Sequence, residues 1–301
     1  MKFFGILPVR RKEMKTKLIR LPRKDRESLA EEVNEERKDF LSREPKPFNP
    51  GYKLGDDEVF KLENFTLPDH LVWAAQNAES CGDLKRTEIK PQTVKAVAGI
   101  SVQGANTAES SEVGVAAFKS LNRSQILDAS RKVFQWTPDT FERRSDPSLI
   151  IPEGLDAVYS EGSLYFKTFR KTNGFLDLTG EFQELTNEAV QGVLDSVGWL
   201  SYQDKDVPLE KALNQTNRRL FSLINATEDF ADLGLELVKT KASELNFPLR
   251  TIDGEDGAEV MLLPSSSGEM KAHLEFLLQR FYPGIFDGKL RRSNSSEVVG
   301  G

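Results

Sequence analysis

Hydrophobic positions between residues 148 and 194 follow two different spacings, and the first of them is typical of strands. An apolar run covers residues 155–159, and an aromatic-rich run covers residues 163–169. Glu161 and Gly162 lie between these runs, and a short glycine-containing turn between two β-rich runs is typical of a β-hairpin. We therefore expect a hairpin at the structural centre of the chain.

The spacing changes after this hairpin. Asn173-Gly174 predicts a second turn, and the short run at 175–178 predicts a third strand. After Thr179 the apolar residues recur with helical spacing. They are Phe182, Leu185, Ala189, Val193 and Val197. Strands followed by an amphipathic helix predict a helix that covers one face of a sheet.

The same spacings predict the elements on either side. Strand-like runs occur at residues 14–21, 94–102, 113–121, 125–127, 132–136 and 259–263. Helical stripes occur at residues 23–41, 209–223, 229–245 and 266–281. These patterns predict an α+β fold, with a mainly antiparallel β-sheet region followed by a largely helical C-terminal region. We expect residues 1–49 to form a basic segment with a strand and a surface helix. Residues 50–200 should form a sheet core with its covering helix. Residues 201–301 should form a helical region with a short strand and a basic tail.

Composition places the chain among folded proteins. Hydrophobic residues make up 38% of the 301 positions and charged residues 29%, which is enough apolar material to bury a core. No apolar run approaches the roughly 18 residues of a membrane-spanning helix, and the N-terminus lacks the features of a signal peptide. The single cysteine, Cys81, cannot form an internal disulfide, which favours a cytoplasmic location.

The charge is unevenly distributed. The chain has a net charge of −6, but residues 1–26 carry ten Lys or Arg against Glu13 and Asp25, so this segment is +8 and the remainder is −14. Such a segment is either a solvated tail or helix face, or a contact to phosphate or to an acidic partner. If Met14 were the original start, residues 1–13 would be an upstream extension.

No catalytic or metal-binding motif stands out, and we predict no catalytic residue, no metal and no cofactor. The two histidines, His70 and His273, lie in no recognisable catalytic motif. A zinc site made with Cys81 would need three distant segments to converge.

A metal-dependent nuclease remains a weaker alternative. It rests on Glu269, which lies near the strand at 259–263, and on Asp156 and Glu161 of the hairpin. Glu269 also follows Ser266 at the spacing of a helix capping box, which explains this carboxylate without catalysis.

Basic doublets recur along this otherwise acidic chain, and they are the best candidates for function. They are Arg143-Arg144, Lys167 with Arg170-Lys171, Arg218-Arg219 and Arg291-Arg292. If several of them share a face, they can neutralise phosphates without reading a base sequence. Solubility and ion pairing are the alternative explanation.

A pattern of blocks from about Met14 to Val299 resembles the KwaB-like family, which belongs to the bacterial Kiwa anti-phage defence system. The blocks are GYKLGDDEVFKLENFTLP, VKAVAGISV, LDAVYSEGSLYFKTFRKTNGFLDLTGEFQELTNEAV, LNQTNRRLFSLI, EVMLLP and LRRSNSSEV. Two features depart from the family pattern. The tail has Arg292-Ser293-Asn294-Ser295-Ser296 where the family has a tyrosine followed by Asn-Ser-Lys, and residues 1–13 look like an addition.

The resemblance implies a cytosolic, non-catalytic effector that binds DNA without sequence preference. It also implies a membrane-embedded partner of the KwaA type, through which the protein would reach the inner face of the membrane. An acidic protein can bind DNA only if its basic residues are segregated onto one face. The alternative is an adaptor that docks the membrane partner, or a second copy of itself as a homodimer, without nucleic acid.

Overall fold

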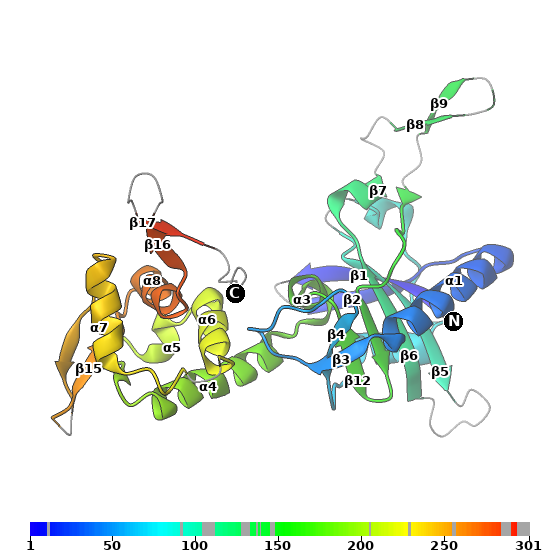
Figure 1. Ribbon diagram of the computed structural model, residues 1–301. Coiled ribbons are helices and arrows are strands. Elements are labelled where there is room, and N and C mark those ends of the chain that lie inside the picture. Colours follow the sequence, from blue (N-terminus) through cyan, green and yellow to red (C-terminus); the bar gives the residue numbers. More distant parts are fainter. Residues whose placement is uncertain are drawn as a thin grey trace. The chain divides into compact units, whose positions relative to one another are not determined.

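The computed structural model separates into two compact units, and each is described by itself (Figure 1). Unit 1 comprises residues 1–48 and 54–179, and unit 2 comprises residues 49–53 and 180–301. The structure describes residues 1–10, 13–90, 93–103, 112–127, 133–136, 138, 140–144, 148–204, 206–227, 230–254, 257–283 and 290–293. The predicted α+β class is confirmed, because a large, mainly antiparallel sheet dominates unit 1 and helices dominate unit 2.

An eight-stranded sheet organises unit 1. Its strands, in order across the sheet, are β2 (Glu13–Leu18), β1 (Lys2–Arg10), β5 (Ala96–Gln103), β6 (Glu112–Ser120), β11 (Ala157–Ser160), β12 (Ser163–Phe166), β4 (Glu58–Leu62) and β3 (Glu44–Pro47). Neighbouring strands are antiparallel except β3 and β4, which are parallel.

Helices cover both faces of this sheet. The predicted surface helix is α1 (Arg23–Ser42), and its buried Val33 and Phe40 pack in one cluster with Ala117 of β6. Because successive side chains of a strand point to opposite faces, the next residue, Phe118, faces the other side. There it contacts Phe175 of α3 (Phe169–Leu176), with ring centroids 5.5 Å apart. A further helix, α2 (Asp69–Gln76), packs beside β2, β5 and β6.

The described residues 1–10 are an integral part of unit 1. β1 pairs with β2 on one side and with β5 on the other, so it is an interior strand of the sheet. Phe3, Phe4, Ile6 and Leu7 are all buried. Among the described cations of residues 1–26, Lys2 and Arg10 lie on β1, Lys15 and Lys17 on β2, Arg20 in the connection to α1, and Arg23, Lys24 and Arg26 at the start of α1.

The predicted central hairpin is confirmed. β11 and β12 pair from Ala157↔Phe166 to Ser160↔Ser163, and the turn is Glu161-Gly162, where both residues have positive φ. The second turn at Asn173-Gly174 and the third strand at 175–178 are wrong. These residues belong to α3 and to the segment that follows it.

The helix α3 forms because its apolar residues suit burial on one side of a helix. Thr172, Phe175 and Leu176 are spaced i, i+3 and i+4 and are all buried. Asp177 follows in the left-handed conformation and ends the helix. Packing against the sheet therefore overrides the local turn preference of Asn173-Gly174.

Short strands and 3₁₀ turns complete unit 1. They are η1 (Arg86–Glu88), η2 (Arg123–Gln125), β7 (Ile126–Leu127), β8 (Val133–Trp136), β9 (Phe141–Arg144) and β10 (Ser148–Leu149). β7 pairs with β10, and β8 pairs with β9 as a separate two-stranded ribbon. The strands expected at 125–127 and 132–136 are therefore present.

Unit 2 is built from helices around a small sheet. Its helices are α4 (Thr179–Ser196), α5 (Leu209–Ala212), α6 (Gln215–Asn225), α7 (Leu235–Glu244) and α8 (Ser267–Leu277). Its strands are β13 (Leu200–Ser201), β14 (Thr251–Asp253), β15 (Glu259–Leu262), β16 (Phe281–Pro283) and β17 (Leu290–Arg292). The core includes Phe221 of α6, Met261 of β15 and Leu274 of α8, all fully buried. The helix predicted after Thr179 is present as α4, but Val190, Val193 and Val197 pack in the core of unit 2, so its role as a cover for the sheet of unit 1 is not confirmed.

Two predicted helices of unit 2 differ in detail. The helix expected at 209–223 is divided into α5 and α6, because Asn214 accepts a hydrogen bond from the Asn217 backbone N–H at 2.9 Å and so caps a new helix. The helix expected from 229 begins only at Leu235. α8 begins at Ser267 as the capping-box spacing predicts, but Ser266 makes no side-chain cap hydrogen bond.

Candidate nucleic-acid interface

The nine predicted DNA-binding residues are divided between the two units. Unit 1 holds Arg143, Arg144, Lys167, Arg170 and Lys171, and unit 2 holds Arg218, Arg219, Arg291 and Arg292. Within each unit, members of one doublet have different surroundings. The reason is geometric, since neighbouring side chains point about 100° apart on a helix and to opposite faces on a strand.

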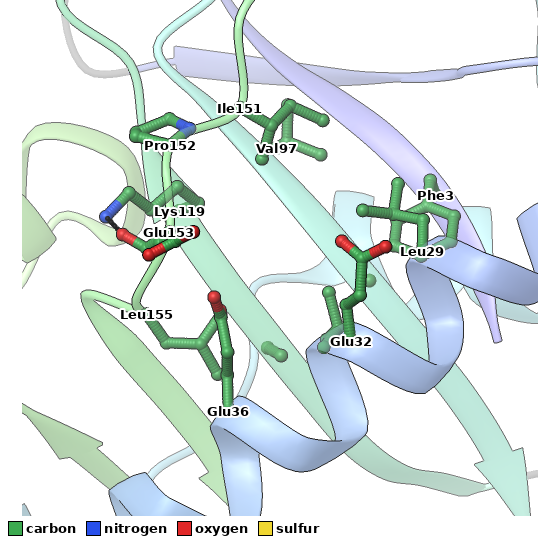
Figure 2. Close-up of a pocket in the computed structure, with 13 residues that line it drawn as sticks. Phe3, Leu29, Glu32, Glu36, Val97, Lys119, Ile151, Pro152, Glu153 and Leu155 are labelled. Carbon is green, nitrogen blue, oxygen red and sulfur yellow. Dashed lines mark hydrogen bonds between the residues drawn. The ribbon is translucent and has the colours of Figure 1, made fainter. Parts of the chain in front are cut away.

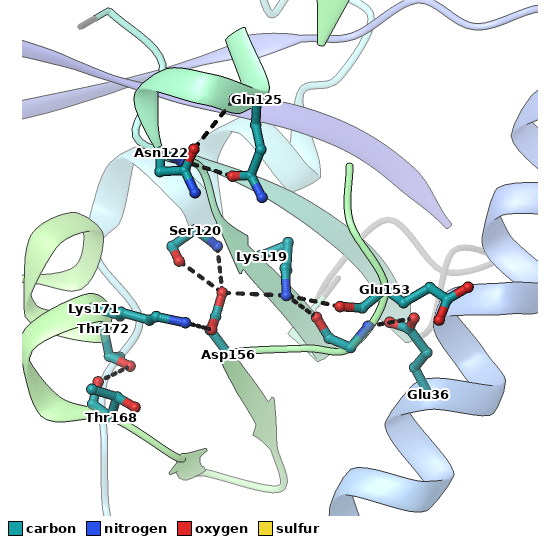
Figure 3. Close-up of polar contacts among 11 residues, drawn as sticks. Glu36, Lys119, Ser120, Asn122, Gln125, Glu153, Asp156, Thr168, Lys171 and Thr172 are labelled. Atoms are coloured by element: carbon teal, nitrogen blue, oxygen red, sulfur yellow. Dashed lines mark hydrogen bonds and ion pairs between the residues drawn. The ribbon is translucent and has the colours of Figure 1, made fainter. Parts of the chain in front are cut away.

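Lys171 is committed to a buried carboxylate. Its Nζ lies 3.0 Å from Asp156 Oδ1, and Asp156 is a buried residue at the start of the central hairpin (Figure 3). The other oxygen of Asp156 accepts hydrogen bonds from the backbone N–H and the hydroxyl of Ser120 at 2.9 and 2.7 Å. Lys119 Nζ lies 3.8 Å from the same oxygen. These contacts join α3 to β6 and β11.

The electrostatics of this network favour a charged Asp156. Burial alone would raise the pKa of Asp156, but the hydrogen bonds from Ser120 and the charges of Lys171 and Lys119 outweigh it and hold this pKa below its ordinary value. Lys119 also donates to the carbonyl oxygens of Glu153 and Gly154. Lys119 and Lys171 therefore contribute to the stability of unit 1, and Asp156 compensates part of their positive charge.

Lys167 is also partly occupied. It follows β12, and its Nζ lies over the ring of Phe40 at 5.0 Å from the centroid, which is a cation–π contact. Burial, followed by the nearby cation Arg43, lowers the pKa of Lys167. This residue is half-buried against α1, so it is a poorer phosphate contact than its neighbours.

Arg170 faces solvent, unlike Lys167, and it is not committed to Asp156 as Lys171 is. It lies in α3, beyond the end of the hairpin at Phe166. Arg143 and Arg144 lie in strand β9, opposite Phe134 and Val133. The side chains of Arg143 and Arg144 lie outside the part of the structure that is described.

The doublet on α6 divides in the same way. Arg218 is half-buried, and its guanidinium donates a hydrogen bond to the Asn187 side chain of α4. Arg219 is exposed, and its Nε donates to the carbonyl oxygen of Pro50 at 3.2 Å. Arg218 therefore joins two helices of unit 2, while most of Arg219 faces solvent.

The last doublet lies on the ribbon of β16 and β17. Arg292 pairs with Phe281 in the register and Arg291 pairs with Tyr282, so the two arginines project from opposite faces. Arg292 reaches back to α8, where its NH1 atom lies 3.0 Å from Glu275 Oε2. Tyr282 and Arg291 are both exposed, so an aromatic ring and a cation lie side by side on the outer face of the ribbon.

Glu275 gathers cations that the sequence patterns did not single out. Lys271 lies one helical turn earlier, with Nζ 3.8 Å from Glu275 Oε1, and Arg280 also interacts electrostatically with this carboxylate. The i, i+4 spacing of Lys271 and Glu275 could have been found from the sequence. The position of Arg280 near Glu275 could not have been found from the sequence, because it depends on how α8 ends.

Acidic side chains of unit 1 gather elsewhere. A pocket between α1 and the sheet is lined by Glu32, Glu36, Glu153 and Lys119 together with apolar residues (Figure 2). Glu36 also accepts a hydrogen bond from the backbone N–H of Gly154 at 2.7 Å. Carboxylates at this pocket repel phosphate, so the pocket is a poor site for DNA.

The candidate nuclease residues do not converge within unit 1. Asp156 and Glu161 lie at opposite ends of β11, roughly 15 Å apart at about 3.3 Å per strand residue. Across the part of the chain that the structure describes, no three His, Cys, Asp or Glu side chains are grouped so that they could hold a metal ion.

The histidines and the cysteine are packed into the fold. His70 Nδ1 lies 2.7 Å from the Thr16 hydroxyl, and Cys81 is buried. His273 is buried as well. Its Nδ1 donates to the Glu269 carbonyl at 2.8 Å, and its ring packs edge-on against Phe247.

Comparison with known proteins leaves the family open. No helix in the described ranges has the length and apolar character needed to cross a membrane. No protein-family model, no curated protein and no solved structure matches the chain.

Proposed function

We propose that this protein is a DNA-binding, non-catalytic component of bacterial anti-phage defence that acts in the cytoplasm with a membrane-embedded partner of the KwaA type. The observation that carries the DNA-binding part is the exposure of cations in the doublets. Arg170, Arg219 and Arg291 are exposed, and the side chains of Lys171 and Arg292 remain 56% and 47% exposed although they pair with Asp156 and Glu275. The defence role and the partner rest on the resemblance of the sequence blocks.

The exposed arginines suit contacts with phosphates. Each guanidinium carries a permanent charge and can donate two parallel hydrogen bonds to a phosphate group. The neighbouring anchored cations hold α3, α6 and the ribbon in place, so the exposed arginines are presented on ordered elements. Contacts of this kind neutralise the DNA backbone and carry no base-sequence information.

Salt-dependent binding of duplex DNA by the full chain tests the proposal. We expect affinity for unrelated sequences to be equal and to fall steeply with salt. Charge reversal at Arg170, Arg219 or Arg291 should weaken binding and reduce the salt slope by about 0.9 for each phosphate that is no longer neutralised. Lys211→Glu, at an exposed position of α5 outside the doublets and outside residues 1–26, is the matched control and should change binding little. Binding that does not depend on salt would contradict the proposal.

An adaptor without nucleic acid is the second candidate, and an apolar groove on unit 2 favours it. The groove is lined by residues of α7, α8 and β16, including Leu237, Phe276 and Phe281. Leu237 is 49% exposed, so this apolar side chain of the groove is open to contact by a partner. Co-purification with the membrane partner in the absence of DNA, abolished by Leu237→Asp, would support the adaptor.

A further inference from the structure

The ribbon of β16 and β17 carries an exposed aromatic ring next to a cation. The two strands are antiparallel, and their register places Tyr282 directly opposite Arg291 (Figure 1). Tyr282 is 47% exposed, and Arg291 is exposed as well. Cβ atoms of directly opposed residues on one face lie about 4.5–5.5 Å apart, so the phenol ring and the stem of the guanidinium are neighbours.

The other face of the ribbon is anchored in unit 2. The ring of Phe281 packs against that of Phe247, with centroids 5.4 Å apart, and the guanidinium of Arg292 lies 3.0 Å from Glu275 Oε2. Phe281 and Arg292 are themselves a register pair. Since side chains alternate along a strand, these contacts turn Tyr282 and its opposite neighbour outward. The outer pair is therefore held on an ordered base.

Positive charge surrounds this pair. Each strand has three residues, and together they include Arg291 and Arg292 and no carboxylate. Arg280 adds a third cation, because the backbone N–H of Ser293 donates to its carbonyl oxygen at 2.8 Å and so fixes the end of β17 beside it. Glu275 on α8 compensates part of this charge through its contact with Arg292. The ribbon therefore attracts an anionic ligand.

Phosphate recognition alone does not account for the ring. A guanidinium contacts phosphate by charge-assisted hydrogen bonds, and these contacts need no aromatic neighbour. An exposed ring instead offers a flat surface on which a nucleobase can stack. In a single strand the bases are free to turn outward and each is linked to a phosphate, whereas in a duplex the bases are stacked and present only their edges. A ring with an adjacent cation therefore suits an unpaired nucleotide.

We propose that the outer face of ribbon β16–β17 is a stacking platform for an unpaired base of single-stranded DNA. Tyr282 stacks on the base, and Arg291 contacts an adjacent phosphate. The inference rests on the proposed function for the claim that the nucleic acid is DNA, and it deepens that function by naming the form of DNA that this surface takes. The platform has no base preference, because every base has a flat face.

Abasic DNA separates stacking from phosphate contacts. The probes are a fluorescent oligo-dT strand and an abasic strand of the same length, which has the same phosphates and no bases. We expect fluorescence anisotropy to show that the full chain binds oligo-dT about tenfold more tightly, the effect of one stacked base. Tyr282→Ala should remove this preference and leave binding of the abasic strand unchanged. Tyr282→Phe keeps the ring and should retain the preference.

Variants at two further positions complete the test. Arg291→Gln should weaken binding of both strands alike and reduce the salt slope by about 0.7, the value for one phosphate of a single strand. Trp73→Ala, which removes a 52% exposed ring of α2 in unit 1, is the matched control and should retain the preference. Thermal unfolding curves verify that each variant is folded.

The outcomes distinguish the platform from the proposed function. Equal binding of oligo-dT and the abasic strand by the unaltered protein, or a preference that survives Tyr282→Ala, overturns the platform, while binding of duplex DNA still supports the proposed function. Binding of none of the three DNA probes contradicts both. Binding of oligo-U RNA without binding of oligo-dT would overturn the assignment to DNA.

Discussion

Lys171 and Arg170 are neighbours in α3, yet only Lys171 reaches the buried carboxylate of Asp156. The two arginines of α6 also differ, since Arg218 is half-buried and Arg219 is exposed. Removal of a charge therefore has two distinct consequences in this protein. We expect it to lower stability where the cation is anchored, and to weaken the proposed DNA contacts where the cation faces solvent.

Substitution of the two neighbours should separate these consequences. Lys171→Ala removes one partner of a buried carboxylate, and we expect the free energy of unfolding to fall by about 1–2 kcal/mol. Arg170→Ala removes an exposed side chain and should change that free energy by less than about 0.5 kcal/mol. Urea denaturation followed by circular dichroism measures both. Equal decreases would show that Lys171 does not support Asp156.

Asp156 should also make stability depend on pH. Its pKa in the folded protein is below that in the unfolded chain, so the unfolded state binds a proton more readily in acid. The stabilisation is therefore complete above the ordinary aspartate pKa of about 4 and is lost as pH falls through the lower, folded pKa. Asp156→Asn should flatten this part of the curve of unfolding free energy against pH. An unchanged acid limb would count against the network.

At the scale of elements, helix ends decide where the candidate residues lie. Gln279 ends α8 in the left-handed conformation, which glycine adopts without the cost that other residues bear. The turn at Gln279 places Arg280 against Glu275. Asp177 ends α3 in the same way and so limits the helix that carries Arg170.

Replacement of Gln279 by glycine should stabilise this helix end. We expect Gln279→Gly to raise the free energy of unfolding by about 0.5–1 kcal/mol, because the relief of left-handed strain exceeds the added entropy of the unfolded chain. Gln279→Ala keeps the strain and should change stability by less than about 0.5 kcal/mol. A calorimetric comparison of the melting temperatures distinguishes the two. If glycine is no better than alanine, the left-handed turn carries little strain.

Hydrophobic spacing predicted most of the long elements, including the central hairpin, α1, α4, β5 and β6. It failed where a turn signal competed with packing, as at Asn173-Gly174, which α3 absorbs because Phe175 and Leu176 are buried. It also could not place the candidate site. The sequence marks Arg292 as half of a doublet, but contact with Glu275 needs the ribbon register and the end of α8, both of which are tertiary features.

The whole of unit 1 depends on its first ten residues. β1 lies between β2 and β5, so a chain that begins at Met14 would lack an interior strand of the sheet. Each buried side chain among Phe3, Phe4, Ile6 and Leu7 contributes about 1.5–3 kcal/mol, and together they rival the stability of a typical domain, about 5–15 kcal/mol.

Removal of residues 1–13 should therefore abolish the native fold of unit 1. The expected result is loss of near-ultraviolet circular dichroism and of a cooperative melting transition. Two single substitutions within β1 test the same claim without removal of the strand. Phe4→Ala should cost about 3–5 kcal/mol, whereas Val9→Ala, at a 49% exposed position, should cost far less. A cooperative transition of unit 1 in the shortened chain would refute the role of β1.

The position of β1 also has a consequence for biosynthesis. Its partner β5 is made late, because Ile6 pairs with Ala96, roughly 90 residues further along the chain. At about 5–20 residues per second, the ribosome needs roughly 5–20 s to deliver that partner. During this delay β2 is the only neighbour that β1 can pair with, so the nascent chain presents an apolar strand with one open edge. Such a strand is the kind of surface that aggregates or recruits a chaperone before the sheet can close over it.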